Sequence, residues 1–310
     1  MSASLDQDAA RLAERRPFRP FGPDEVLGDA GLFRETLHLF VAGGVRLHVE
    51  TPFGPHPVAE LPAPFLFDLR GVLGGAERVC RAEPFPGSAA VAIPADEARR
   101  LLVASGDDGA AFRRIALSGL TAALRATIGS LSSFFDPPAG ASAAEEAPSN
   151  PPPVEEQPVD PESAGALLDA AGLDPAILPS LGLVARTLMP GAALFTEGGT
   201  GGEAAIVAEG RLRVSVHIPG AGEEALAILG PGEVVGEMAL VDDAPRSASV
   251  FAHNGPATVY VLPRDVFRRL LDSGDDKGAP LLAGIAIVLA RRLEQVLRKA
   301  AGFRILSGPI

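Results

Sequence analysis

The chain has few cysteines, few aromatic residues and no long apolar segment. Its 310 residues contain one cysteine, Cys80, one tyrosine and no tryptophan. A single cysteine excludes a disulfide within the chain, and this scarcity is typical of proteins from reducing compartments. The longest apolar run covers residues 281–290, which is too short to span a bilayer. The first 16 residues lack the apolar core of a secretion signal, so we expect a cytoplasmic protein without a membrane anchor.

Positive charge is also scarce. The chain has 27 lysine and arginine residues against 39 aspartate and glutamate residues, which gives a formal net charge of −12. The phosphates of nucleic acids and the headgroups of anionic lipids repel a chain of this charge. We therefore expect neither nucleic acid nor a membrane surface among its partners.

Residue patterns that indicate catalysis are missing as well. The five histidines are scattered without the spacing of metal ligands. The sequence contains no Gly-x-Ser-x-Gly nucleophile motif and no phosphate-binding loop of the P-loop type. We expect that the protein is not an enzyme and holds no metal.

The chain contains instead a series of short apolar runs separated by glycine and proline. Apolar residues alternate with polar ones over residues 45–49 and again over residues 212–216, which is the period of a half-buried strand. Several such runs are followed by helical patterns, such as the apolar face over residues 281–297. This order predicts a mainly β protein with flanking helices, built as an antiparallel β jelly roll.

A segment of different composition divides the chain. Residues 136–162 hold eight prolines and seven acidic residues, and neither lysine nor arginine. Such a segment is stiffened by proline, repels itself and cannot bury a core. On either side of it the sequence repeats at an offset of about 168 positions. Residues 41–44 are similar to residues 207–210, and residues 99–108 to residues 268–276. We therefore predict two tandem copies of one jelly-roll fold.

The most specific pattern begins at Gly236 and ends at Val250. Gly236 allows close approach of the backbone, and the turn after it offers amide groups to an anion. Arg246, nine positions after Glu237, supplies a planar cationic fork that suits a phosphate, and Ser247 adds a hydroxyl. Glu237 repels a phosphate, so we assign it to a sugar hydroxyl. The alternative interpretation is a strand-turn-strand corner with a surface ion pair between Glu237 and Arg246.

This stretch resembles the phosphate-binding cassette of the cyclic nucleotide-binding domain family. Pro190-Gly191, Glu197-Gly198 and Glu209-Gly210 also stand where that family has similar pairs, so the resemblance covers about residues 181–297. It implies that the ligand is cAMP or cGMP, with Glu237 on the ribose 2′-hydroxyl and Arg246 on the phosphate. The residues that it places at the ligand are Gly236, Glu237, Met238, Ala239, Leu240, Arg246, Ser247 and Ala248.

The first copy has lost most of this cassette. Asp68 and Leu69 stand opposite the Gly-Glu pair, Val79 stands opposite Ser247, and Arg78 stands opposite the cassette arginine. An aspartate at this place repels a phosphate, so we expect a degenerate copy that binds no nucleotide. The predicted domains are a flexible N-terminus over residues 1–30, the degenerate domain over 31–135, the linker over 136–162, and the nucleotide-binding domain with its C-terminal helices over 163–310.

These features predict a regulatory protein. Nucleotide binding in the second domain would move the helices after Pro263 and change the contacts with an unidentified protein partner. The alternative is a scaffold whose two jelly-roll domains serve protein–protein contact and no longer bind nucleotide. The C-terminal helix could mediate a homodimer or pack into a core, and the sequence leaves both open. We expect no helix-turn-helix after it, since residues 303–310 are all that remain. The sequence does not separate cAMP from cGMP.

Overall fold

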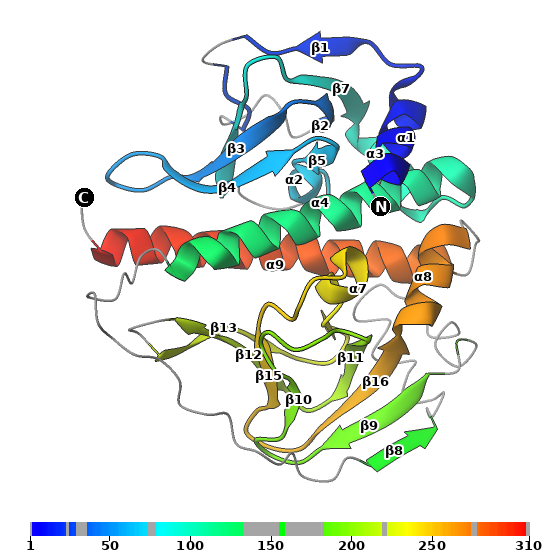
Figure 1. Ribbon diagram of the computed structural model, residues 1–310, viewed down its shortest axis with the longest axis vertical. Helices are drawn as coiled ribbons and strands as arrows, with labels where there is room; N and C mark the ends of the chain where they lie inside the picture. The colour runs from blue at the N-terminus through cyan, green and yellow to red at the C-terminus, as the bar shows by residue number, and fades with distance from the viewer. Residues whose placement is uncertain are drawn as a thin grey trace. The chain divides into compact units, whose positions relative to one another are not determined.

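The chain folds into two compact units in the computed structural model (Figure 1). The first unit contains Met1–Phe134 and Leu271–Ile310, and the second contains Phe135–Leu270. The structure describes residues 2–22, 25–28, 36–73, 79–132, 155–158, 181, 183–218, 222–273 and 278–307.

The strands of the first unit form two antiparallel sheets. They are β1 Phe18–Pro20, β2 Thr36–Ala42, β3 Gly44–Val49, β4 His56–Pro62, β5 Phe65–Phe67, β6 Cys80–Pro84 and β7 Ala89–Pro94. One sheet has the order β1-β7-β2-β5, and the other has the order β4-β3-β6. The central strand β2 therefore pairs with β5 and β7, and the central strand β3 pairs with β4 and β6.

An aromatic stack lies in the core of this unit. The ring of Phe40 on β2 lies 5.2 Å from the ring of Phe21 and 5.0 Å from the ring of Phe65, measured between centroids. Stacked aromatic pairs contribute about 0.5–1.5 kcal/mol each beyond the area they bury. The stack fixes β5 against β2, and so fixes the start of the turn that carries Asp68.

Two long helices of the first unit lie side by side, as Figure 1 shows for α4 and α9. The helices of this unit are α1 Ser2–Ala13, α2 Leu69–Val72, α3 Ala95–Val103, α4 Gly106–Ser132 and α9 Gly278–Ser307. The apolar face predicted for the terminal helix is buried, since Leu282, Ile285 and Leu289 are each 0% exposed. The sequence left open whether this helix mediates a homodimer or packs into a core. Its burial within the first unit corresponds to packing into a core.

The N-terminus is a packed helix, whereas its sequence predicted a flexible segment. Ala9 and Leu12 on α1 are buried. Asp8 accepts hydrogen bonds of 2.7 Å from two nitrogens of Arg114 on α4, and these bonds raise the pKa of Arg114. The short apolar pattern of this alanine-rich helix gave a weak signal, and its charged partner lies 106 positions away in the sequence.

The strands of the second unit also form two antiparallel sheets, ordered β10-β15-β12-β13 and β14-β11-β16-β9-β8. The strands are β8 Glu155–Pro158, β9 Val184–Leu188, β10 Ala193–Phe195, β11 Glu203–Glu209, β12 Leu212–Ile218, β13 Gly222–Leu229, β14 Val234–Val235, β15 Ser249–Ala252 and β16 Ala257–Pro263. The short helix α7 Met238–Asp242 lies between β14 and β15, and α8 Arg264–Ser273 follows β16.

The two copies predicted from the sequence share one topology. Strand β11 pairs with β14 and β16, as β2 pairs with β5 and β7, and β12 pairs with β13 and β15, as β3 pairs with β4 and β6. The register shift between Phe40 and Ala42 recurs between Val207 and Glu209. Equivalent strands keep the offset of about 168 positions. The predicted fold class, tandem antiparallel jelly rolls with flanking helices, is confirmed.

The boundaries of the two compact units differ from the domain boundaries expected from the sequence. Leu271–Ile310 belongs to the first unit, although the sequence analysis grouped it with the second domain. The apolar stripe of a helix shows that it packs, but does not identify the surface it packs on. Within the expected linker, β8 pairs with β9, and the rest of that segment lies outside the described residues. Residues 159–180, which include the start of the second predicted domain, also lie outside them.

Among the described residues, no helix combines the length and the apolar character that crossing a membrane requires.

Candidate functional site

The cassette predicted from the sequence forms a strand, a tight turn, a short helix and a second strand. Strand β14 ends at Val235, Gly236 has a φ of +82°, and α7 follows. Asp243 ends α7 with a φ of +60°. Glycine takes the first conformation without strain, and aspartate is among the few residues that tolerate the second. The local sequence therefore fixes both ends of the turn, and Pro245 leads the chain back toward β15.

Glu237 lies at the start of α7 and is 1% exposed. Its backbone carbonyl accepts hydrogen bonds from the amides of Leu240 and Val241, at 2.9 and 3.1 Å. A carboxylate removed from water needs compensating charge or hydrogen bonds, and Arg246 interacts with it electrostatically. Because Glu237 and Arg246 are both buried, the alternative interpretation of a surface ion pair is wrong.

Arg246 is 7% exposed, and its side chain is held on three sides. Its Nη1 donates to the carbonyl oxygen of Gly236 and its Nη2 donates to that of Glu203, each at 2.7 Å. The guanidinium carbon lies 3.7 Å from the centroid of the Phe195 ring, a cation–π contact. Arg246 therefore joins the cassette to β11 and β10.

The guanidinium of Arg246 is a buried positive charge with unused donors. Burial lowers the pKa of Arg246, while the negative charges of Glu203 and Glu237 act to raise it. An arginine keeps its proton at neutral pH even so. The Nε–H is buried and makes no hydrogen bond to any described residue. A buried cation that is only partly hydrogen-bonded is a site where an anion is stabilised.

The loop between β10 and β11 packs against the same arginine. The backbone amide of Gly198 donates to the carbonyl of Arg246, and the amide of Arg246 donates to the carbonyl of Gly199, both at 2.9 Å. A Cβ on Gly201 would lie 3.3 Å from the guanidinium carbon and 2.4 Å from the Cβ of Ala239. The sequence marked this loop by Glu197-Gly198 but gave no sign of its contact with Arg246. Its glycines allow the close approach of backbone to Arg246 and to α7.

The remaining residues predicted at the ligand lie on the same short segment. The side chains of Met238, Ala239, Leu240 and Ala248 are buried. Ser247 is half-buried, and its hydroxyl lies 3.9 Å from the sulfur of Met238. The amide of Leu240 already donates to the carbonyl of Glu237, so it is occupied within the turn. The cassette therefore brings its predicted residues together, but not all of their polar groups are available to a ligand.

Two arginines on α8 contact the C-terminal end of the cassette helix α7, and no motif in the sequence marked them. Arg264 forms an ion pair with Asp243 and donates to the backbone carbonyls of Gly201 and, at 3.1 Å, Ala239. Arg268 contacts both carboxylate oxygens of Asp243, at 2.6 and 2.5 Å. We call Asp243, Arg264 and Arg268 the α8 clamp. Exposed single ion pairs contribute little, but a bidentate network of several charges contributes more.

The first unit keeps the shape of the cassette without its chemistry. Asp68 has a φ of +75° and is followed by α2, as Gly236 is followed by α7. The next position is Leu69, so the buried carboxylate has no counterpart there. Arg78, the predicted match of the cassette arginine, lies outside the described residues. Elsewhere, the described part of the chain has no group of three or more histidine, cysteine or acidic side chains placed to hold a metal ion.

Residues 185–273 match the family model described as the cyclic nucleotide-binding domain. This match confirms, for that segment, the family resemblance seen in the sequence. The segment runs from the second residue of β9 through α8 and includes all of the cassette.

Two curated proteins are similar to part of the chain. The chain is 37% identical over 115 residues to the cyclic AMP receptor protein of Thermus thermophilus, which is 36% of this chain and 49% of that protein. It is 28% identical over 135 residues to the CRP-like cAMP-activated global transcriptional regulator of Mycobacterium tuberculosis, which is 42% of this chain and 58% of that protein. The chain thus spans about half the length of the curated relatives it matches.

A solved structure is similar at lower identity. The cyclic nucleotide-binding domain from Methylobacillus flagellatus is 22% identical, with a TM-score of 0.43, over 51% of this chain and 90% of that one.

Proposed function

We propose that the chain is a regulatory, non-catalytic protein that binds cAMP or cGMP in its second unit and transmits the signal through α8 to a protein partner. The match of residues 185–273 to the cyclic nucleotide-binding domain supports the ligand class. The cassette supports the position of the ligand, because it holds Glu237 and Arg246 in one buried segment.

The observation that carries the proposal is the set of donors on Arg246. A guanidinium has five N–H groups, and the protein uses two of them in hydrogen bonds among the described residues. A cyclic phosphate has two unesterified oxygens, which a guanidinium can bind in a bidentate way. In the proposed complex these oxygens take donors that remain on Arg246 and neutralise its buried charge.

Glu237 supplies the opposite chemistry. An ionised carboxylate only accepts hydrogen bonds, so it repels the phosphate and suits a hydroxyl donor. In a 3′,5′-cyclic nucleotide the 2′-hydroxyl is the ribose hydroxyl that remains free. We therefore assign Glu237 to the 2′-hydroxyl and Arg246 to the phosphate, with Ser247 beside the phosphate.

Ligand binding is tested by calorimetric unfolding of the full chain with cAMP, cGMP and, as a control, 5′-AMP. A ligand at a hundredfold excess over its Kd stabilises its binding unit by about 2.7 kcal/mol. We expect a higher unfolding temperature with at least one cyclic nucleotide and no comparable rise with 5′-AMP. No rise with either cyclic nucleotide at millimolar concentration would refute the proposal.

Glu237→Gln is expected to remove the preference for a ribose hydroxyl. Hydrogen bonds to charged groups contribute about 1.5–3 kcal/mol, so the wild type should bind cAMP roughly ten- to a hundredfold more tightly than 2′-deoxy-cAMP. In the variant this ratio should fall toward one. Isothermal titration of both ligands to both proteins measures it. An equal ratio in wild type and variant would mean that Glu237 does not contact the sugar.

The α8 clamp is the proposed route of the signal. Ligand bound at the cassette would shift the turn that ends at Asp243, and Arg264 and Arg268 would pass that shift to α8. Asp243→Asn keeps the left-handed backbone but removes the charge. We expect nucleotide binding to persist, while the ligand-induced change in amide exchange of α8 is lost. Asp265→Asn, an exposed position on α8, is the control and should keep the change. A full response of α8 in Asp243→Asn would exclude this route.

One observation favours the scaffold alternative, in which the cassette no longer binds nucleotide. The two carbonyls that bind Arg246 give it a structural role even without a ligand. The calorimetric experiment separates the two functions, because a scaffold gains no stability from a cyclic nucleotide. DNA binding is not part of either proposal, since the net charge of −12 opposes it.

A further inference from the structure

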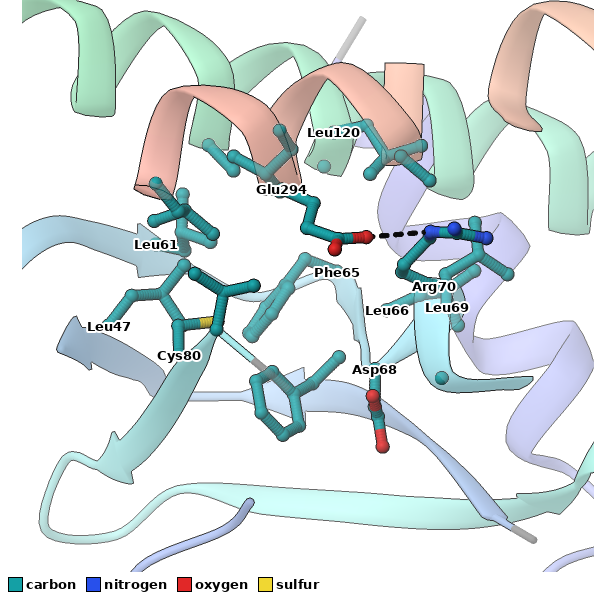
Figure 2. Close-up of a pocket in the computed structure, with 18 residues that line it drawn as sticks. Leu47, Leu61, Phe65, Leu66, Asp68, Leu69, Arg70, Cys80, Leu120 and Glu294 are labelled. Atoms are coloured by element: carbon teal, nitrogen blue, oxygen red, sulfur yellow. Dashed lines mark hydrogen bonds and ion pairs between the residues drawn. The ribbon is translucent and has the colours of Figure 1, made fainter. Parts of the chain in front are cut away.

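A cavity of about 90 Å³ in the first unit lies beside the degenerate cassette. Figure 2 shows its walls: Leu47 and Leu61 come from β3 and β4, and the segment over residues 65–71 lies below α9. Helix α4 adds Leu120, and α9 adds Leu297. The cavity lies entirely within the first unit.

The cavity is lined by hydrocarbon at the positions where the second copy carries polar groups. Leu69, a lining residue, stands where the second copy has Glu237, and Val79, another lining residue, stands where it has Ser247. The left-handed turn at Asp68 is kept. The first copy has therefore kept the left-handed turn of the cassette, and apolar side chains stand where the second copy has the acceptor and the hydroxyl.

Two of the charged groups at the cavity, Glu294 and Arg70, form an ion pair, and Asp68 also lines it. Glu294 reaches from α9 to Arg70, whose Nε donates to it at 2.9 Å (Figure 2). Burial acts to raise the pKa of Glu294, but hydrogen bonds from Arg298 and Arg70 outweigh it and lower that pKa. Glu294 is therefore an anion at neutral pH, and its charge is already matched by the two arginines. Glu294 therefore offers no unmatched charge to a ligand, and most of the other lining residues are apolar.

We propose that the first unit binds a small, uncharged, apolar molecule about the size of one aromatic ring in this cavity. An enclosed apolar cavity of about 150 Å³ takes up benzene, and the cavity of the first unit is of the same order of size. Removal of the apolar surface of one such ring from water favours its binding there. This site is independent of the cyclic nucleotide site proposed in the second unit.

Cys80 provides a reporter for occupancy. It lines the cavity, it is half-buried, and it is the one cysteine of the chain. Toluene is the probe, and the rate at which N-ethylmaleimide alkylates Cys80 in the full-length protein is the readout. At ten times its Kd, toluene should slow alkylation about tenfold, because the free fraction falls by that factor. An unchanged alkylation rate at saturating toluene would overturn the proposal.

A matched pair of variants on α4 locates the site. Ala123 lines the cavity and is 2% exposed, whereas Ala122 is exposed on the same helix. Ala123→Leu should fill part of the cavity and abolish the protection of Cys80 by toluene. Ala122→Leu should leave that protection intact. Equal protection in the two variants would show that toluene binds elsewhere, and would overturn the proposal.

A third variant keeps the test decisive if Ala123→Leu does not fold. Leu47→Ala enlarges the cavity from its β3 wall, so naphthalene, which is too large for the wild type, should then slow alkylation of Cys80. Failure of naphthalene to protect this variant counts against the cavity as the site.

A final experiment tests whether the cavity of the first unit binds a nucleotide instead of an apolar molecule. With Arg246→Ala, in which the second unit should no longer bind nucleotide, cAMP should not protect Cys80, while toluene still should. Protection by cAMP in that variant would mean that the first unit binds nucleotides, and would overturn the apolar assignment. The toluene result stands whether or not the second unit binds a nucleotide.

Discussion

Replacing Arg246 with alanine is expected to lower the affinity for a cyclic nucleotide by about 2–5 kcal/mol, roughly 30-fold to several thousandfold. The reason is that truncating one partner of a buried, hydrogen-bonded charge pair leaves the phosphate without compensation. Isothermal titration with cAMP and cGMP measures the loss. Wild-type affinity in Arg246→Ala would end the assignment of the phosphate to this residue.

The same substitution is expected to destabilise the second unit by about 1–3 kcal/mol. It removes the charged donors from the carbonyls of Gly236 and Glu203, and hydrogen bonds to charged groups contribute about 1.5–3 kcal/mol each. Part of this loss is offset because the guanidinium charge no longer has to be buried. Tyr260 on β16 is buried in the second unit and is the chain's one tyrosine, and there is no tryptophan. Its fluorescence during urea unfolding therefore reports on this unit alone.

Two variants control for charge and for position. Arg246→Lys keeps a positive charge but lacks the planar fork, so it should lose most of the affinity while recovering part of the stability. Arg269 lies exposed on α8 in the same unit, so Arg269→Ala should change neither quantity by more than about 0.5 kcal/mol. If Arg269→Ala weakened binding as much as Arg246→Ala does, the effect would be one of net charge and not of the cassette.

The sequence predicted the cassette because its constraints are local. A glycine at Gly236, an acid at the next position and a proline before Arg246 fix a turn within a dozen residues, and each has a conformational reason. The repeat was visible for a similar reason, since apolar alternation and glycine turns recur at one offset. What these patterns specify is the backbone path and the types of residue placed on it.

The contacts that complete the site could not be predicted in this way. Arg246 binds two backbone carbonyls, and a carbonyl has no sequence signal because every residue has one. Its stacking on Phe195 and the ion pairs from Arg264 depend on a sheet that brings distant segments together. For the same reason, residues 271–310 were assigned to the second domain on the sequence alone. The apolar face of a helix does not identify the core on which it packs.

Gly236→Ala is expected to have the second large effect, on both stability and binding. A Cβ at this position would lie 2.5 Å from Nη1 of Arg246 and 2.5 Å from Cε2 of Phe195. Both atoms are ends of side chains, but neither can move freely. Arg246 is held by the carbonyl of Gly236 itself, and Phe195 is held by its stacking on the guanidinium. The added methyl group must therefore break the contacts that position the phosphate-binding donors.

Gly222→Ala separates this clash from backbone strain. Gly222 has a φ of +83°, nearly that of Gly236, and a Cβ there would meet no atom within 4 Å. Both variants carry the cost of an alanine in the left-handed region, about 1–2 kcal/mol. Any further loss of unfolding free energy in Gly236→Ala is the cost of displacing Arg246 and Phe195. We expect this cost to be about 1–3 kcal/mol, and we expect the variant to lose cyclic nucleotide binding. Gly222→Ala should bind as the wild type does. Equal loss of stability in the two variants, with cyclic nucleotide binding kept in both, would mean that the Arg246 side chain can move away from the turn. The hydrogen bond from Arg246 to Gly236 would then not be required for the site.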